Sequence, residues 1–75
     1  MLSIEEKNLL SKYSIALEDI DVCASFLMGD DVKSPLYYIE DSLTGATKDE
    51  RRTLEAIVER RAKQLKDFLS RTPMG

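Results

Sequence analysis

The 75-residue chain offers few side chains suited to catalysis. It contains no histidine and one cysteine, Cys23. Without histidine there is no ordinary general base near pH 7, and the chain lacks the base of a Ser–His or Cys–His nucleophile. A lone cysteine makes no convincing transition-metal site. We therefore expect no enzymatic activity, no cofactor and no metal site, and we expect Cys23 to be a small buried core residue.

Arg61 lies in the middle of the apolar stripe of a predicted helix, within the stretch VERRAKQL (residues 58–65). Three hypotheses account for an arginine at this position. Its aliphatic stem crosses the stripe while its guanidinium pairs with a nearby acid of the same chain, which would be Glu18, Asp19 or Asp21. It pairs instead with a carboxylate across an oligomer interface. Or it binds, together with Arg60, an anionic small ligand such as a nucleotide.

The N-terminal part of the chain predicts a first helix over residues 4–28. Ser3 and Glu6 have the spacing of a capping box, and Gly29 suits the end of the helix. Between them runs an apolar seam at alternating spacings of four and three, which is typical of a helix face. The seam consists of Leu9, Tyr13, Ala16, Ile20, Cys23 and Leu27.

A short second helix is predicted over residues 35–43. Pro35 suits its first position, where the missing N–H is not needed, and Ser34 precedes it as a cap. Gly45 ends it.

A long third helix is predicted over residues 48–71, opened by the capping box of Thr47 and Glu50 and stopped by Pro73. Its apolar stripe consists of Leu54, Ile57, Val58, Ala62, Leu65, Phe68 and Leu69. The two long helices have similar lengths. The sequence therefore predicts an all-α single domain over residues 1–75, built as an antiparallel helical hairpin of two long helices with a short connecting helix.

A second apolar stripe, formed by Ile15, Val22 and Phe26, lies roughly opposite the main seam of the first predicted helix. A two-layer hairpin buries one stripe per helix, so this second stripe has two interpretations. In the first interpretation, the short helix folds back over Val22 and Phe26 and leaves Ile15 exposed. Alternatively, the stripe is a surface for self-association or for a partner protein, with Tyr38 as a further aromatic anchor.

Size and composition favour an interaction protein. A monomer of this length buries only about 60% of its unfolded surface, and a partner chain is one source of the missing stability. We expect a homo-oligomer, with a dimer favoured, that acts on another protein as a regulator, adaptor or inhibitor. Short acidic chains without catalytic groups are typical of phages and mobile elements, which suggests such an origin.

Nucleic-acid binding through the third helix is a further hypothesis, and the charge pattern argues against it. The net charge of the chain is −3, and Glu55 and Glu59 interrupt the basic residues of that helix. A surface that follows a phosphate backbone needs uncompensated positive charge.

The chain has no apolar segment that approaches the roughly 18 residues of a membrane span, so we expect no membrane partner. Its single cysteine fits a reducing compartment, and the expected location is the cytoplasm.

Overall fold

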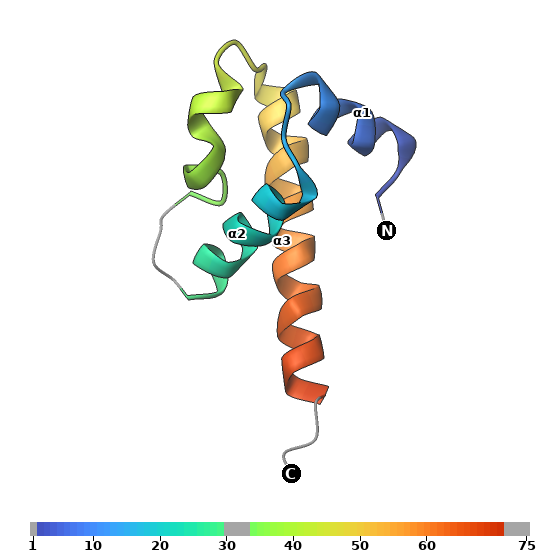
Figure 1. The fold of residues 1–75 in the computed structure, drawn as a ribbon, viewed down its shortest axis with the longest axis vertical. Coiled ribbons are helices and arrows are strands. Elements are labelled where there is room, and N and C mark those ends of the chain that lie inside the picture. The colour runs from blue at the N-terminus through green and yellow to red at the C-terminus, as the bar shows by residue number, and fades with distance from the viewer. Residues whose placement is uncertain (1, 30–33, 72–75) are drawn as a thin grey trace.

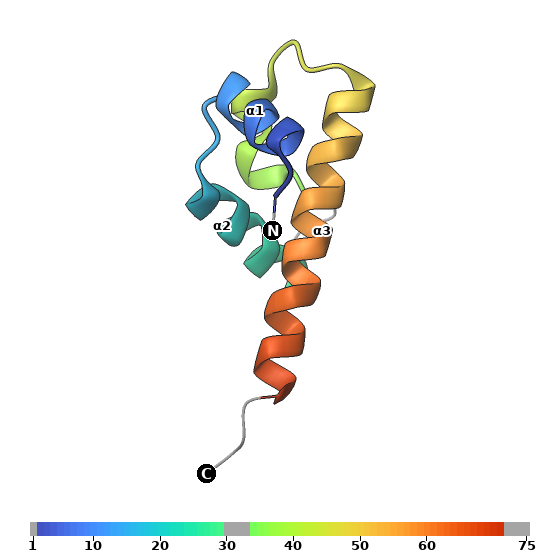
Figure 2. The same cartoon turned by 90° about the vertical axis from the view of Figure 1, so that its right-hand side faces the viewer.

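The fold is all-helical, as predicted. The computed structural model describes residues 2–29 and 34–71. The regular elements in these ranges are α1 (Ile4–Lys12), α2 (Leu17–Met28), the 3₁₀ helix η1 (Tyr37–Leu43) and α3 (Lys48–Arg71). α3 runs along the long axis of the molecule, and the other helices lie beside its N-terminal part (Figure 1, Figure 2).

The predicted continuous helix over residues 4–28 is wrong, because the chain turns sharply after Lys12. Ser14 has a φ of 56°, in the left-handed region that interrupts a right-handed helix. The N–H of Ile15 donates to the carbonyl of Leu10 at 2.8 Å, and the N–H of Ser14 donates to Ser11 at 3.1 Å. These two bonds form a Schellman motif, which satisfies the last carbonyls of α1.

α2 then begins as a separate helix. The Asp19 carboxylate accepts a hydrogen bond from the N–H of Ala16 at 3.0 Å, so an acidic side chain in the first turn caps a residue that has no polar side chain of its own. The predicted hairpin of two long helices is not confirmed, since the first long helix is divided in two. The packing of α2 against α3 is the part of that arrangement that the structure retains.

The core lies where α2, η1 and α3 meet beside the end of α1. Its buried side chains are Leu10, Ile15, Ile20, Cys23, Leu36, Ile39, Leu43, Leu54, Ile57 and Val58. Cys23 is buried among them, as predicted. All three regular α-helices and η1 therefore contribute to a single apolar cluster.

η1 and α3 follow the predicted positions closely. η1 is a 3₁₀ helix that starts at Tyr37, two residues later than the predicted short helix. Gly45 follows it with a φ of 86°, a backbone conformation that side-chain-bearing residues rarely adopt. α3 spans Lys48–Arg71, the same bounds that its capping box and stripe predict. The predicted stop at Pro73 lies outside the described residues.

Candidate functional site

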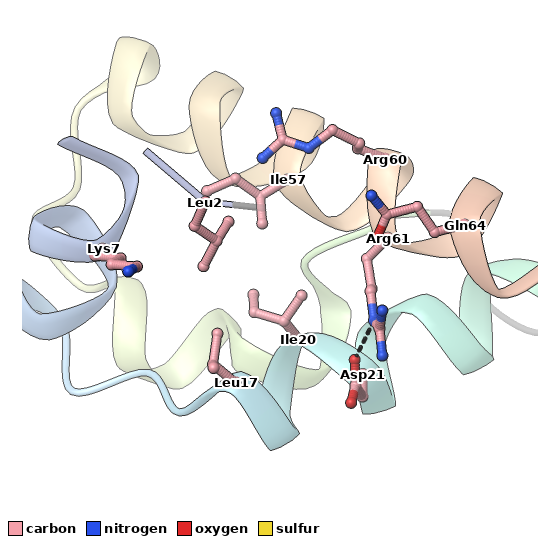
Figure 3. A pocket seen from close by; sticks show the side chains of 9 residues that line it. All are labelled: Leu2, Lys7, Leu17, Ile20, Asp21, Ile57, Arg60, Arg61 and Gln64. Atoms are coloured by element: carbon pink, nitrogen blue, oxygen red, sulfur yellow. Dashed lines mark hydrogen bonds and ion pairs between the residues drawn. The ribbon is translucent and has the colours of Figure 1, made fainter. Parts of the chain in front are cut away.

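A cavity of about 390 Å³ lies between α1, α2 and α3. Leu2, Leu17, Ile20 and Ile57 form its apolar surface, with charged and polar side chains around them (Figure 3). The polar members are Lys7, Asp21, Arg60, Arg61 and Gln64. Both arginines predicted as anion or ion-pair candidates therefore line the same cavity.

Arg61 pairs within the chain. Its Nε donates to Oδ1 of Asp21 at 2.6 Å, across the contact between α3 and α2. This is the first of the three hypotheses for Arg61, and Asp21 is the partner among the three acids considered. The side chains of Arg61 and Asp21 are 40% and 49% exposed, so the pair lies at the edge of the core. Arg61 is therefore a boundary residue, with its stem over the apolar stripe and its charge near solvent.

Arg60 joins α3 to α1 through Glu6. One guanidinium nitrogen donates to both carboxylate oxygens of Glu6 at 2.9 Å. Glu6 also closes the capping box of α1, because it accepts a hydrogen bond from the N–H of Ser3 at 2.9 Å. The Ser3 N–H and then the Arg60 guanidinium hold the pKa of Glu6 below its ordinary value. Glu6 thus performs a local capping role and a long-range pairing role.

Sequence reasoning missed the contribution of α1 to this cavity. Leu2 and Lys7 line it only because the turn at Ser14 directs α1 back along α3. A straight helix over residues 4–28 would place them far from Arg60. The local signal for the turn is Asp19, three residues after Ala16, which can cap a new helix there. The apolar periodicity continues through these residues and therefore predicts a single helix.

The four residues predicted as an interface do not form one exposed surface. Ile15 is only 6% exposed and belongs to the core, so its predicted surface role is wrong for this chain. The turn at Ser14 rotates it away from the position that a continuous helix would give it. Val22 and Phe26 are partly buried, and the rings of Phe26 and Tyr38 lie 6.1 Å apart.

η1 therefore packs against α2, as the first interpretation of the second stripe requires. Tyr38 remains half exposed, and Tyr37 beside it is also exposed. A role of Val22, Phe26 and Tyr38 in binding a partner stays a prediction.

The C-terminal part of α3 exposes apolar side chains. Ala62 is the last buried residue of the helix among those described. Beyond it, Leu65 is partly buried, whereas Phe68 and Leu69 are 69% and 64% exposed. Residues 63–71 extend the helix by roughly 13 Å at 1.5 Å per residue. Figure 1 shows this segment projecting below the other helices.

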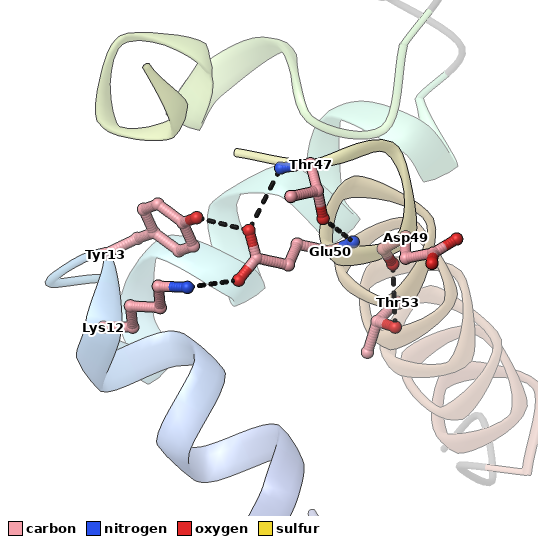
Figure 4. A network of polar contacts seen from close by, with 6 residues as sticks. All are labelled: Lys12, Tyr13, Thr47, Asp49, Glu50 and Thr53. Carbon is pink, nitrogen blue, oxygen red and sulfur yellow. Dashed lines mark hydrogen bonds and ion pairs between the residues drawn. The ribbon is translucent and has the colours of Figure 1, made fainter. Parts of the chain in front are cut away.

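A polar network fixes the start of α3 against the end of α1 (Figure 4). The Glu50 carboxylate accepts hydrogen bonds from the N–H of Thr47, from the Tyr13 hydroxyl and from the Lys12 ammonium. The bonds from Lys12, Tyr13 and Thr47 lower the pKa of Glu50 from 4.5 to about 2. The sequence indicates the capping role of Glu50 but not its two partners from α1. Because Lys12 and Tyr13 end α1, the network holds the turn in place.

Reactive groups are few in the described part of the chain. Burial, and secondarily Asp19, raises the pKa of the Cys23 thiol, which makes a nucleophilic thiolate less accessible. Residues 2–29 and 34–71 contain no cluster of three or more His, Cys, Asp or Glu side chains suited to hold a metal ion. No helix in the same ranges is long and apolar enough to cross a membrane.

Comparison with protein-family models, with curated proteins and with solved structures found no match to this chain. The fold and the surfaces of the chain are therefore the basis for a functional proposal.

Proposed function

We propose that this chain is a non-catalytic interaction protein that self-associates through the projecting end of α3 and acts on another protein as a regulator, adaptor or inhibitor. The observation that carries the proposal is the apolar stripe of Leu65, Phe68 and Leu69, of which Phe68 and Leu69 are exposed. Monomeric proteins expose single apolar side chains freely, but a contiguous apolar patch on a projecting element is typical of a binding surface.

The position of this patch on the helix supports an interaction role. Leu65 and Leu69 continue the stripe that Leu54 and Val58 begin, with the same helical spacing. In the first part of α3 this stripe forms the core, whereas in the last part Leu69 is exposed. Short helical segments gain most of their stability from packing, so a partner that covers the exposed side chains of residues 63–71 would also stabilise this end of the helix.

A second copy of the chain is the occupant that we propose for this patch. Two projecting helix ends laid side by side would each provide the apolar stripe that the other needs, as in an isologous interface. The stripe beyond Ala62 contains few large side chains, and stable interfaces bury about 800 Å² per partner. We therefore expect a weak dimer, which leaves the same surface available to a different protein.

Nucleic-acid binding through α3 has less support. Arg51, Arg60 and Arg61 each form an ion pair with a carboxylate of another element. The Glu40 carboxylate, 2.6 Å from Arg51, raises the pKa of that guanidinium. Arginines that are already neutralised contribute little to the release of counterions that drives phosphate binding.

Sedimentation velocity over a range of protein concentrations tests self-association, with Leu69→Gln as the disrupting variant. Ile4→Gln is the matched control, because Ile4 is an aliphatic residue that is 77% exposed on α1, away from the patch. Both substitutions keep the net charge at −3 and introduce a good helix former. We expect Leu69→Gln to weaken the dimer at least tenfold, since a two-fold interface loses the side chain twice.

The wild-type chain and Ile4→Gln should dimerise equally, and the association should change little between low and high salt because the contact is apolar. A wild-type chain that stays monomeric at every concentration would contradict self-association. An equal loss in Ile4→Gln would show that the patch is not the interface.

A further inference from the structure

The cavity between α1, α2 and α3 has the size of a small-ligand site. Its volume of about 390 Å³ lies near the lower end of the roughly 300–1,000 Å³ that ligand pockets occupy. Three helices that are separated in sequence contribute to its wall, so it forms only in the folded chain. Leu17 lines it and remains exposed, which leaves an aliphatic surface open to an incoming molecule.

The lining separates an apolar part from a charged part. In Figure 3 the lining side chains of Leu2, Leu17, Ile20 and Ile57 lie between those of Lys7 and Arg61. The cationic side chains of Lys7, Arg60 and Arg61 surround them. A molecule that fits this arrangement has an aliphatic portion and a negatively charged end.

The balance of charges indicates how much negative charge the ligand carries. Arg61 is matched by Asp21, and Arg60 is matched by Glu6. Among the described residues, the Lys7 ammonium forms no ion pair or hydrogen bond, so one positive charge of the lining is uncompensated. The net charge of the whole chain is −3, which makes this cationic lining a local exception. One free positive charge complements a monoanion.

The anionic end has a defined place in the cavity. Figure 3 shows Lys7 on one side of the apolar side chains and the Arg61–Asp21 pair on the opposite side. The Arg61–Asp21 pair lies on the α2 side. An anion beside Lys7 can therefore accept a hydrogen bond from its ammonium without breaking the pair that joins α2 to α3.

We infer that this cavity binds a small aliphatic carboxylate, with its alkyl chain against Leu17, Ile20 and Ile57 and its carboxylate beside Lys7. A nucleotide fits less well, because the lining contains no aromatic side chain to stack on a base and has a single uncompensated charge. This inference narrows the anionic ligand anticipated from Arg60 and Arg61 to one chemical class, and it is independent of self-association.

An amide-resolved NMR titration with octanoate tests the inference. Octan-1-ol keeps the alkyl chain without the charge, acetate keeps the carboxylate without the chain, and AMP presents a nucleotide. We expect octanoate to shift the amide signals of Leu17, Ile20 and Ile57 in a saturable way. Its affinity should exceed that of each of the other three compounds at least tenfold.

Lys7→Gln distinguishes recognition of the carboxylate from general adsorption of an alkyl chain. Lys7 lies on the surface of α1 and glutamine is a good helix former, so the variant should fold normally. Lys63→Gln is the matched control, because it removes an exposed lysine of α3 that does not line the cavity. We expect Lys7→Gln to weaken octanoate binding several-fold and to leave the response to octan-1-ol unchanged, whereas Lys63→Gln should change neither.

Three results would overturn the inference. The first is the absence of saturable shifts with octanoate, and the second is equal binding of octanoate and octan-1-ol. The third is tighter binding of AMP. The titration is repeated in Leu69→Gln at a concentration where that variant is monomeric. A monomeric variant that fails to bind octanoate would contradict the ligand site in the cavity. A wild-type chain that fails to dimerise would contradict only self-association through the end of α3.

Discussion

The two parts of α3 carry the same apolar stripe in different surroundings. In residues 48–62 the stripe is buried, with Leu54, Ile57 and Val58 almost fully covered by the other elements. In residues 63–71 it is largely exposed. The helical periodicity continues across the boundary near Arg61, so the pattern identifies the face of the helix but not what covers that face.

The polar contacts of α3 divide at the same place. In the described part of the chain, every ion pair between α3 and another element involves residues 50–61. These pairs connect α3 to α1, to η1 and to α2. The N-terminal part of α3 is therefore the scaffold on which the other helices assemble, and the C-terminal part extends away from that scaffold.

The largest expected effect compares one leucine from each part. Leu54→Ala removes a side chain with no exposed surface and leaves a cavity in the core, which should lower the free energy of unfolding by about 2–5 kcal/mol. Leu69→Ala removes an exposed side chain and should change it by less than about 0.5 kcal/mol. Urea denaturation measures both values, at protein concentrations low enough to keep the chain monomeric.

A similar loss in both variants would contradict this difference between the two parts of α3, because it would show that residues 63–71 are packed as tightly as the first part of the helix. A loss of stability in Leu69→Ala that grows with protein concentration would instead support the role of this segment in self-association. That result would place the cost at the dimer contact rather than in the monomer.

Local signals predicted most of α3 and η1, because the determinants are close together in sequence. The capping box of Thr47 and Glu50 starts α3 with the expected hydrogen bonds. Gly45 supplies the positive φ that the preceding turn requires. Each of these features involves residues within a few positions of each other, so a sequence pattern contains them completely.

The turn at residues 13–16 could not be predicted in the same way. Ser14 is neither glycine nor asparagine, so its left-handed conformation has no strong local preference behind it. Burial of Leu10 and Ile15 and the pairing of Tyr13 with Glu50 offset the cost of that conformation. These are tertiary interactions, and they overrule a helical seam that continues through the turn.

The candidate site likewise has one part that the sequence indicates and one part that depends on tertiary structure. The position of Arg61 on the stripe led to three hypotheses, and one of them was pairing with an acid near residue 20, because facing helices bring such residues together. The cavity itself was not predicted, since Leu2 and Lys7 reach it only through the turn at Ser14. The expected surface position of Ile15 failed for the same reason.

A smaller effect is expected at the boundary between the two parts of α3. Arg61→Ala should lower the free energy of unfolding by about 0.2–1 kcal/mol, the range for exposed ion pairs, because both partners are partly solvated. Asp21→Asn alone should have a similar effect, and the double variant should cost little more than either single one. If the loss in the double variant equals the sum of the losses in the two single variants, the ion pair contributes nothing. The stem of Arg61 would then provide the stability.

The last expected effect is a dependence of stability on pH that arises in the N-terminal part of α3. Pairing with Lys12, Tyr13 and Thr47 lowers the pKa of Glu50 from 4.5 to about 2, so folding favours the ionised carboxylate. The resulting stabilisation is complete above about pH 4.5 and is lost as the pH falls toward 2. Glu50→Gln keeps a residue suited to the capping box and removes the charge.

The stability of the wild-type chain should therefore exceed that of Glu50→Gln at neutral pH, and the difference should shrink between pH 4.5 and 2. Thermal unfolding followed by circular dichroism at a series of pH values measures this difference. Leu69→Gln is the control from the C-terminal part of α3, because it changes no titratable group, and at a concentration where the chain is monomeric its difference from wild type should be the same at every pH. A constant difference for Glu50→Gln would mean that the carboxylate acts only as a hydrogen-bond acceptor, and that its charge does not hold α1 against α3.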